Sequence, residues 1–190
     1  MASRALYVHS LTDGELITQS SLTAEAFHEL FDRHFKAVHR YVARRVGSDR
    51  ADDLASQTFT VAFARRATFR SEVRDGRPWL FGIATNLLMN ERRAEQRSLE
   101  AVARIQAQSL RPAAEPVEDG LDPLVAASLA ELDPDQRDVL LLFAWGELSY
   151  EEIALALAIP VGTVRSRMSR ARRHLRLRLE PSVQPEEDSR

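Results

Sequence analysis

Residues 148–179 read LSYEEIALALAIPVGTVRSRMSRARRHLRLRL, and this stretch decides how the chain is organised. Ser149 and Glu152 have the spacing of a capping box, which predicts the start of a short helix. Residues 159–162 predict a tight turn, and an arginine-rich helix is expected over about 163–179. A short helix, a turn and a second helix form the helix-turn-helix arrangement, whose second helix enters the DNA major groove.

The predicted helix 163–179 has an apolar stripe on one side and cations on the other. At about 100° per residue, its apolar side chains fall in one narrow arc: Val164, Met168, Ala171, Leu175 and Leu179. Residues 165–178 hold seven arginines and no acid. The arginines could simply solvate an exposed helix, but unrelieved like charges repel one another, which a purely structural helix normally avoids. The cationic face is therefore predicted to contact DNA.

The start of this helix carries the side chains best suited to reading bases. Arginine can bond bidentately to guanine, and serine can donate or accept a hydrogen bond. We expect base contacts from Arg165, Ser166, Ser169 and Arg170, with Thr163 beside them. Phosphate contacts are expected from Arg167, Arg172 and Arg173.

Charge separates along the chain in a way that the net value of -2 hides. Residues 21–97 carry fourteen basic and ten acidic side chains, so the front half is mildly basic. Acids dominate residues 131–152, directly before the arginine-rich stretch. Such segregation is typical of a protein with a nucleic-acid-binding surface.

Composition predicts an all-α, cytoplasmic protein. Long stretches rich in Ala, Leu, Arg and Glu favour helices, and 190 residues suffice for one good core or two small ones. The absence of cysteine excludes disulfides, thiolate metal sites and a cysteine nucleophile. Apolar runs such as 139–145 are too short to insert across a membrane, and residues 1–19 carry acids where a signal peptide would be apolar.

Three helices are predicted in the front half. Apolar residues at three- and four-residue steps indicate helices over about 23–46, 48–66 and 78–97, with a polar loop at 67–77. Gly47 ends the first helix, Ser48 or Asp49 can cap the second, and Pro78 suits the first turn of the third. The side chains expected to be buried on the second and third helices are Leu54, Phe59, Val61 or Ala62, Phe63, Trp79, Leu80, Ile83, Leu87 and Leu88.

The back half follows a polar stretch. Residues 111–122 contain Pro, Gly and four acids, which predicts a flexible linker. Helices are expected over about 124–132 and, from the start signal at Asp133, to about residue 145. Ile153, Leu155 and Leu157 are expected to be the apolar face of the short helix that follows. The fold class is therefore all-α, with two small helical domains joined by a flexible linker: an N-terminal extension at 1–22, domains at 23–97 and 123–180, a linker at 98–122 and a tail at 181–190.

Several segments match a known pattern. In the back half they are LDPDQRDVL at 132–140, LSYEEIA at 148–154, IPVGTVRSR at 159–167 and RAR at 170–172, which closely resemble region 4 of the extracytoplasmic-function sigma factors of the sigma-70 family. In the front half they are FDRH at 31–34 with Tyr41, DDL at 52–54 with Phe59, and PWLFGIATN at 78–86, which resemble region 2. Ser-Gln at 56–57 stands where Gln-Glu is usual, so one carboxylate of the pattern is missing.

This resemblance implies a non-enzymatic subunit that binds bacterial core RNA polymerase, recognises promoter DNA and helps to open it. Region 4 would read the minus 35 element as duplex DNA through the residues of helix 163–179 named above. Region 2 would bind the polymerase clamp helices through Asp53, Ser56 and Gln57. It would also capture the melted strand of the minus 10 element, for which the candidates are Phe69, Arg74, Arg77, Asn86, Asn90 and Arg93. The resemblance also implies an anti-sigma protein as partner, and it implies no cofactor.

Some of these side chains have a plainer interpretation. Trp79 suits the core better than a stacking role, and Phe69 suits either equally. Asn86 and Asn90 could simply be solvated. The acids at 52–53 could serve only to compensate the helix dipole.

Two other functional classes compete with the sigma factor. An ordinary helix-turn-helix regulator explains only the back third and would not need the PWLFGIATN segment. A helical hydrolase using Asp52, Asp53 and a histidine would lack a phosphate loop, a nucleophile elbow and a metal-ligand pair. His28, His34 and His39 have no obvious convergent partner, so no metal site is expected.

Overall fold

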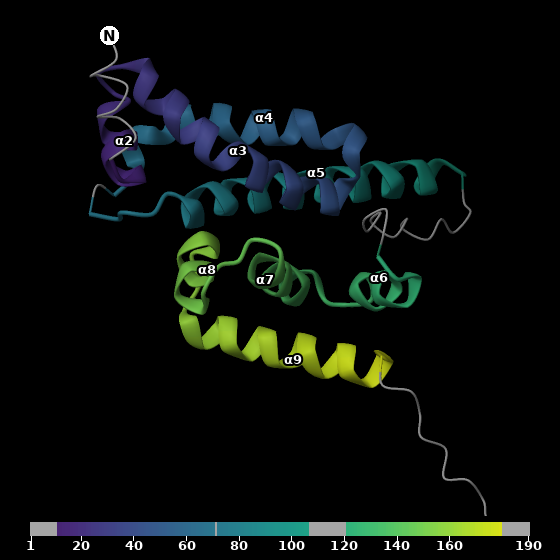
Figure 1. Cartoon of the computed structure of the whole chain (residues 1–190). Helices are drawn as coiled ribbons and strands as arrows, with labels where there is room; N and C mark the ends of the chain where they lie inside the picture. Colours follow the sequence, from purple (N-terminus) through teal and green to yellow (C-terminus); the bar gives the residue numbers. More distant parts are fainter. Residues whose placement is uncertain (1–10, 71, 107–120, 180–190) are drawn as a thin grey trace, which may run out of the picture.

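The computed structural model describes residues 11–70, 72–106 and 121–179, and the side chains of 99–106 lie outside the description. All the elements in these ranges are helices. We call the helices up to residue 106 the front group and those from residue 123 the back group. In Figure 1 the front group lies above the back group. The predicted all-α fold class with two small helical units is confirmed. Most of the predicted linker and the whole of the predicted tail fall outside the described residues.

The front group packs three long helices together, with a short helix at one end (Figure 1). Its elements are α2 (Asp13–Gln19), α3 (Ala24–Val46), α4 (Ser48–Arg65), the 3-10 helix η1 (Arg66–Thr68) and α5 (Arg77–Gln106). Gly47 alone separates α3 from α4, and its φ of 80° lies in the region that favours glycine. The hydroxyls of Tyr41 and Thr85 lie 2.9 Å apart in the buried centre and tie α3 to α5.

Local details of the front group differ from the sequence prediction. Gly47 occupies the N-cap of α4, so the predicted cap at Ser48 or Asp49 is wrong. Phe63 was predicted to be buried and is 39% exposed, with its ring packed edge-on against that of Phe27. Helix α5 continues nine residues beyond the expected end at 97. Helix α2 was not predicted at all.

The back group contains α6 (Pro123–Ala130), α7 (Pro134–Ala144), α8 (Tyr150–Leu157) and α9 (Val161–Leu179). The predicted start of α7 is confirmed, since the Asp133 carboxylate accepts a 3.0 Å hydrogen bond from the Asp135 N–H. Helix α9 begins two residues earlier than predicted. Ile153 is buried as expected, whereas Leu155 is 62% exposed and does not belong to the core.

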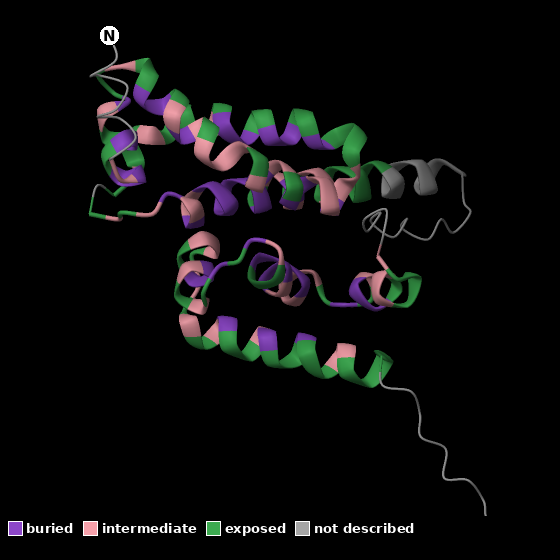
Figure 2. Cartoon of the chain, viewed as in Figure 1, coloured by how far each residue is buried: buried purple, intermediate pink, exposed green. Residues whose placement is uncertain are grey.

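The two groups meet along a contact that we call the domain contact: α3 and α5 on one side, α7 and α8 on the other. Arg45 of α3 and Asp138 of α7 form an ion pair of 2.7 Å whose side chains are both only 4% exposed. The Arg77 guanidinium donates a 2.6 Å hydrogen bond to the Gly146 carbonyl. Gly82 of α5 lies directly against the backbone of Ala156 in α8. Buried residues accordingly line the facing sides of both groups (Figure 2).

Candidate nucleic-acid interface

The α8–turn–α9 unit is built by local hydrogen bonds. The predicted capping box is confirmed: the Ser149 hydroxyl accepts from the Glu152 N–H, and the Glu152 carboxylate accepts from the Ser149 N–H at 2.7 Å. Ala158 ends α8 in the left-handed region at φ 52°. The carbonyl of Pro160 then accepts from the N–H of Thr163 at 2.9 Å, which starts α9. The sequence therefore forms the predicted helix-turn-helix geometry.

Burial of α9 agrees with the helical-wheel prediction over its first three turns. Val164, Met168 and Ala171 are buried against α7 and α8, whereas Leu175 is half-buried and Leu179 is 36% exposed. The solvent side of α9 is green along its length in Figure 2. The helix is thus anchored by one stripe and leaves the opposite face open.

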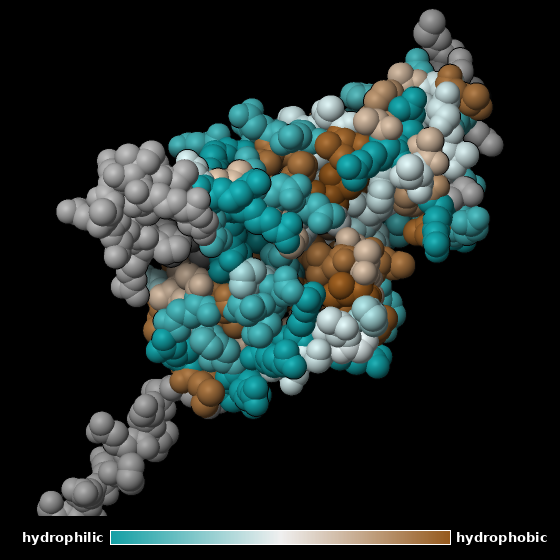
Figure 3. Space-filling model, turned by 180° about the vertical axis from the view of Figure 1, so that it is seen from behind, coloured by the Kyte–Doolittle hydropathy of each residue, from teal (hydrophilic) through white to brown (hydrophobic). Residues whose placement is uncertain are grey.

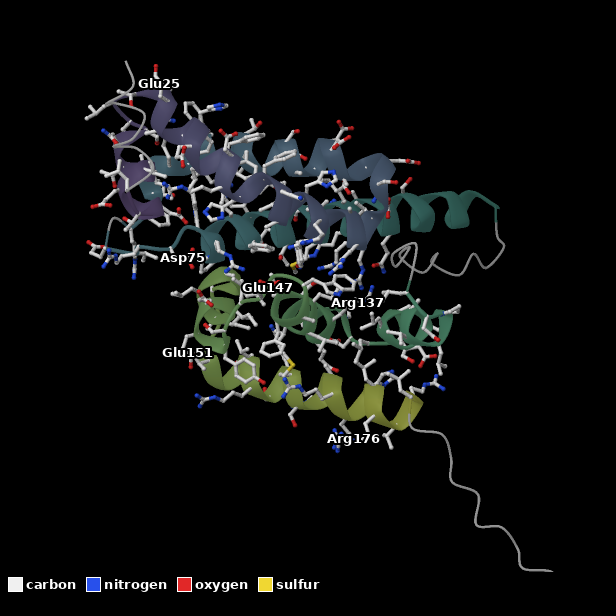
Figure 4. All side chains as sticks on the ribbon, viewed as in Figure 1. Glu25, Asp75, Arg137, Glu147, Glu151 and Arg176 are labelled. Carbon is white, nitrogen blue, oxygen red and sulfur yellow. The ribbon has the colours of Figure 1, made fainter. Side chains whose placement is uncertain are left out.

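Most of the predicted DNA contacts lie on this open face. The exposed members are Arg165, Ser166, Ser169, Arg170, Arg172 and Arg173, and Thr163 is half-buried at the turn. Arg165 has a weak partner in Glu151 of α8, 3.8 Å away, and both side chains are 66% exposed. Figure 4 labels Glu151 on α8 and Arg176 farther along α9. The face from Arg165 to Arg173 is therefore open to a ligand.

Arg167 and Arg172, two of the predicted phosphate contacts, have closer partners inside the back group. Arg167 forms an ion pair with Asp135 of α7 and is 24% exposed. Arg172 lies with its guanidinium carbon 5.3 Å from the ring centre of Phe143. These contacts fix the rotation of α9 on α7. Arg167 is consequently less available as a phosphate contact than the sequence suggests.

The predicted minus 10 residues of the front group lie on α5 and on the chain that leads to it. Asn86, Asn90 and Arg93 are all exposed on successive turns of α5. Phe69 is half-buried and its ring lies 5.1 Å from that of Trp79, so the two aromatic residues form one partly accessible cluster. Arg74 is exposed.

Arg77 does not lie with the other minus 10 candidates. Its guanidinium is directed into the domain contact, where it bonds the Gly146 carbonyl. Its charge also acts on Glu152 of α8. In this arrangement Arg77 joins the two groups and is half-buried.

The predicted polymerase-binding side chains form an exposed face of α4. Asp53, Ser56 and Gln57 all point away from the core, while Leu54 and Thr58 on the other side of the helix are buried. Asp52 beside them pairs with His39 at 3.0 Å, so a contact within the chain accounts for Asp52 and no ligand is needed to explain it.

Electrostatics within the site follow from these pairs. Burial opposes ionisation of Glu152, but hydrogen bonds from Ser149 outweigh it and keep the pKa of Glu152 below its usual value. A hydrogen bond from Arg178 likewise lowers the pKa of Glu131. Both acids are therefore charged at neutral pH, Glu152 in the capping box of α8 and Glu131 beside Arg178 near the end of α9.

The described residues contain no group of three potential metal ligands. His28, His34 and His39 each pair instead with a carboxylate, those of Asp32, Asp13 and Asp52. Among the described helices, none is both long and apolar enough to cross a membrane. Most of the surface seen from behind is hydrophilic, with apolar residues gathered in a few places (Figure 3).

Comparisons with known proteins agree with this geometry. Residues 30–98 match the family model "Sigma-70 region 2", and residues 124–175 match "Sigma-70, region 4". The ECF RNA polymerase sigma factor SigL of Mycobacterium tuberculosis is 31% identical over 154 residues, which cover 80% of this chain and 87% of SigL. The chain belongs to the extracytoplasmic-function sigma factors.

Other sigma factors are similar to this one over most of its length. The ECF RNA polymerase sigma-E factor of Salmonella typhimurium is 30% identical over 171 residues, covering 84% of this sigma factor and 89% of that protein. Among solved structures, CnrH in complex with the cytosolic domain of CnrY has a TM-score of 0.64 at 27% identity, covering 88% of this chain and 96% of that one. A chain of the Bartonella quintana complex between the sigma factor RpoE and the anti-sigma factor NepR has a TM-score of 0.63 at 25% identity and covers 82% and 98%.

The matched ranges assign the helices of this sigma factor. Most of α3, all of α4 and α5 up to residue 98 fall in region 2, and α6 to α9 fall in region 4 except for Pro123 and the last four residues of α9. The domain contact therefore joins region 2 to region 4. The sequence analysis did not predict this contact. The signal available for it was Arg45, a charged residue that lies one turn after Tyr41 on the apolar face of α3.

Proposed function

We propose that this sigma factor reads the minus 35 element as duplex DNA with the open face of α9. The observation that carries the proposal is that the apolar stripe of α9 is buried while Arg165, Ser169 and Arg170 stay exposed on its first turns. In a helix-turn-helix, the N-terminal part of the second helix contacts base edges. Arg173 and Arg172 follow on the same open side and suit phosphates.

The proposal assigns capture of the melted minus 10 strand to region 2. Phe69 beside Trp79 offers an aromatic surface on which a base can stack. Asn86 and Asn90 offer amides to base edges, and Arg74 and Arg93 offer charge to phosphates. Unstacking a base costs a few kcal/mol, so contacts between the unstacked base and the protein must supply at least that much binding free energy.

Core RNA polymerase is proposed to bind the exposed face of α4 at Asp53, Ser56 and Gln57. Support comes from their shared exposure on a helix whose other side is fully packed. Each region alone contacts few phosphates, so affinity for free DNA should be weak and sensitive to salt. Polymerase would raise it by holding both regions on one promoter.

An anti-sigma protein is proposed as a regulator. The solved RpoE relative is in complex with the anti-sigma factor NepR, which supports a partner of this kind. The proposed role is one of binding and DNA opening in the cytoplasm, and it requires no catalytic residue from this chain.

In vitro transcription with bacterial core polymerase tests the proposal. Wild-type protein should give initiation on some templates of a promoter library, and Arg170→Ala should reduce it strongly on those templates. Arg178→Ala is the matched control, because Arg178 lies at the far end of α9 and pairs with Glu131. Failure of the wild type to bind core polymerase, together with tight dimeric binding to duplex DNA, would instead indicate an ordinary regulator.

A further inference from the structure

Helix α2 lies outside both ranges that match the sigma-70 regions. It is nevertheless firmly packed, since Leu16 and Ile17 are fully buried in the front group. Figure 1 shows it directly beside the chain that leads into α5. The buried acid at its first position, Asp13, has contacts that packing alone does not require.

Asp13 connects three parts of region 2. One carboxylate oxygen, Oδ2, accepts a hydrogen bond from the Gly76 N–H at 3.0 Å and lies 2.7 Å from His34 Nε2. The other, Oδ1, lies 3.3 Å from Arg33 Nη1. The side chain is only 10% exposed. Burial opposes its ionisation, but His34, Gly76 and Arg33 outweigh burial and keep the pKa of Asp13 below its usual value.

A second bond and a close approach fix the same segment. The Gly14 N–H donates to the Arg74 carbonyl at 3.2 Å. A Cβ at Gly76 would lie 3.1 Å from Asp13 Cβ and 3.3 Å from Ile17 Cδ1, so the backbone there is pressed against α2. We call residues 72–76 the pre-α5 segment.

The pre-α5 segment also sets the start of α5. The Gly76 carbonyl accepts from the Leu80 N–H at 3.0 Å, in the first turn of the helix that carries Asn86. The segment itself carries the exposed Arg74. The backbone position of Arg74, a proposed contact to the melted strand, therefore depends on α2. The start of α5, which carries the other proposed contacts, depends on it as well.

We infer that Asp13 is a positioning residue for promoter opening: from α2 it holds the pre-α5 segment in the conformation that captures the melted minus 10 strand. This inference rests on the proposed function. Asp13 itself is buried and does not touch DNA. Its loss should therefore act on strand recognition by region 2 and leave duplex reading by α9 unchanged.

The test measures binding of fluorescent single-stranded DNA by holoenzyme assembled from core polymerase and the full chain. The probe is the non-template strand of a promoter at which the wild type initiates, and the comparison probe has its minus 10 bases scrambled. Asp13→Ala should reduce the affinity ratio between the two probes by about tenfold, the factor expected for losing one charge-assisted hydrogen bond. A role limited to stability would lower both affinities together and leave the ratio unchanged.

Three further variants sharpen the result. Gly76→Ala pushes the segment away from Asp13 and should reproduce the loss. Asp32→Ala is the charge-matched control, because Asp32 is exposed on α3 and pairs with His28 and not with the pre-α5 segment. Asp13→Asn keeps an oxygen for the Gly76 N–H and should restore part of the ratio.

The outcomes separate the two proposals. A wild-type protein that supports no initiation overturns the proposed function, and the inference with it. A functional wild type with an Asp13→Ala variant that keeps the wild-type ratio overturns the inference alone. All variants are compared at a temperature where circular dichroism shows each to be folded.

Discussion

Gly82→Ala should open the domain contact. A Cβ at Gly82 would overlap the carbonyl oxygen of Ala156 and lie 3.1 Å from its carbonyl carbon. The obstacle is the backbone of α8, which cannot rotate away as a side chain could. The two helices must therefore move apart, or the two regions must separate.

The size of the effect follows from the overlap at this contact. Overpacking costs about 1–3 kcal/mol, and a backbone obstacle puts this contact near about 3 kcal/mol. Replacing a helical glycine by alanine also gains about 1 kcal/mol of helix propensity, but α5 is helical in both arrangements, so this gain does not change their ratio. The cost to the closed arrangement is therefore about 3 kcal/mol, which lowers the ratio of closed to open molecules about 150-fold.

Single-molecule energy transfer in the free protein measures this ratio. The chain has no cysteine, so Lys36→Cys on α3 and Leu177→Cys on α9 give two specific, exposed label sites. Gly162→Ala is the matched control, since a Cβ there meets nothing within 4 Å. Gly82→Ala should shift the molecules to low transfer, whereas Gly162→Ala should leave them at high transfer. A Gly82→Ala distribution equal to wild type, or a wild type already at low transfer, would refute the close packing of α5 on α8.

Three other outcomes are expected. Asp138→Ala leaves the buried charge of Arg45 without its ion-pair partner and should lower the unfolding free energy in urea by about 3–5 kcal/mol, whereas replacing both residues by apolar ones of similar size should be nearly neutral. In DNA titrations, Arg173→Ala should weaken binding to all DNA sequences alike and reduce the slope of log affinity against log salt concentration by about 1. Arg170→Ala should cost about 1–3 kcal/mol of binding free energy on the cognate site only. An equal effect of Arg170→Ala on all sequences would contradict base reading by Arg170. Because the pKa of Asp13 is lowered in the folded state, its ionisation stabilises the fold fully above the usual pKa of 3.8, and this stabilisation is lost as pH falls through the lower folded pKa. The difference in unfolding free energy between wild type and Asp13→Asn should therefore shrink below about pH 4. A difference that stays constant with pH would argue against this ionisation.

Local chemistry explains why much of the site could be predicted from the sequence. The Ser149–Glu152 capping box and the Asp133 cap depend on residues two or three positions apart, and both form as expected. The exposed face of α9 follows from helical periodicity once Val164 and Met168 are buried. Short-range signals of this kind do not depend on the rest of the fold.

Long-range pairing explains what the sequence could not predict. Arg167 was predicted to contact DNA, but its guanidinium forms an ion pair with Asp135, which lies 32 positions earlier in the sequence. Helix α2 has its own capping box at Thr12 and Glu15, a local signal from which its start could have been predicted. Its attachment to Gly76, 63 positions away from Asp13, has no local signature.

Arg77 links the domain contact to the proposed function. In the closed arrangement its guanidinium bonds the Gly146 carbonyl of region 4, so the same group is not available to a DNA phosphate. Separation of the regions would release it next to Arg74 and the start of α5. Gly82→Ala, which favours separation without altering any charged group, should then free Arg77 as well. On the sequence prediction that Arg77 contacts the melted strand, closed packing and strand capture would compete for this arginine.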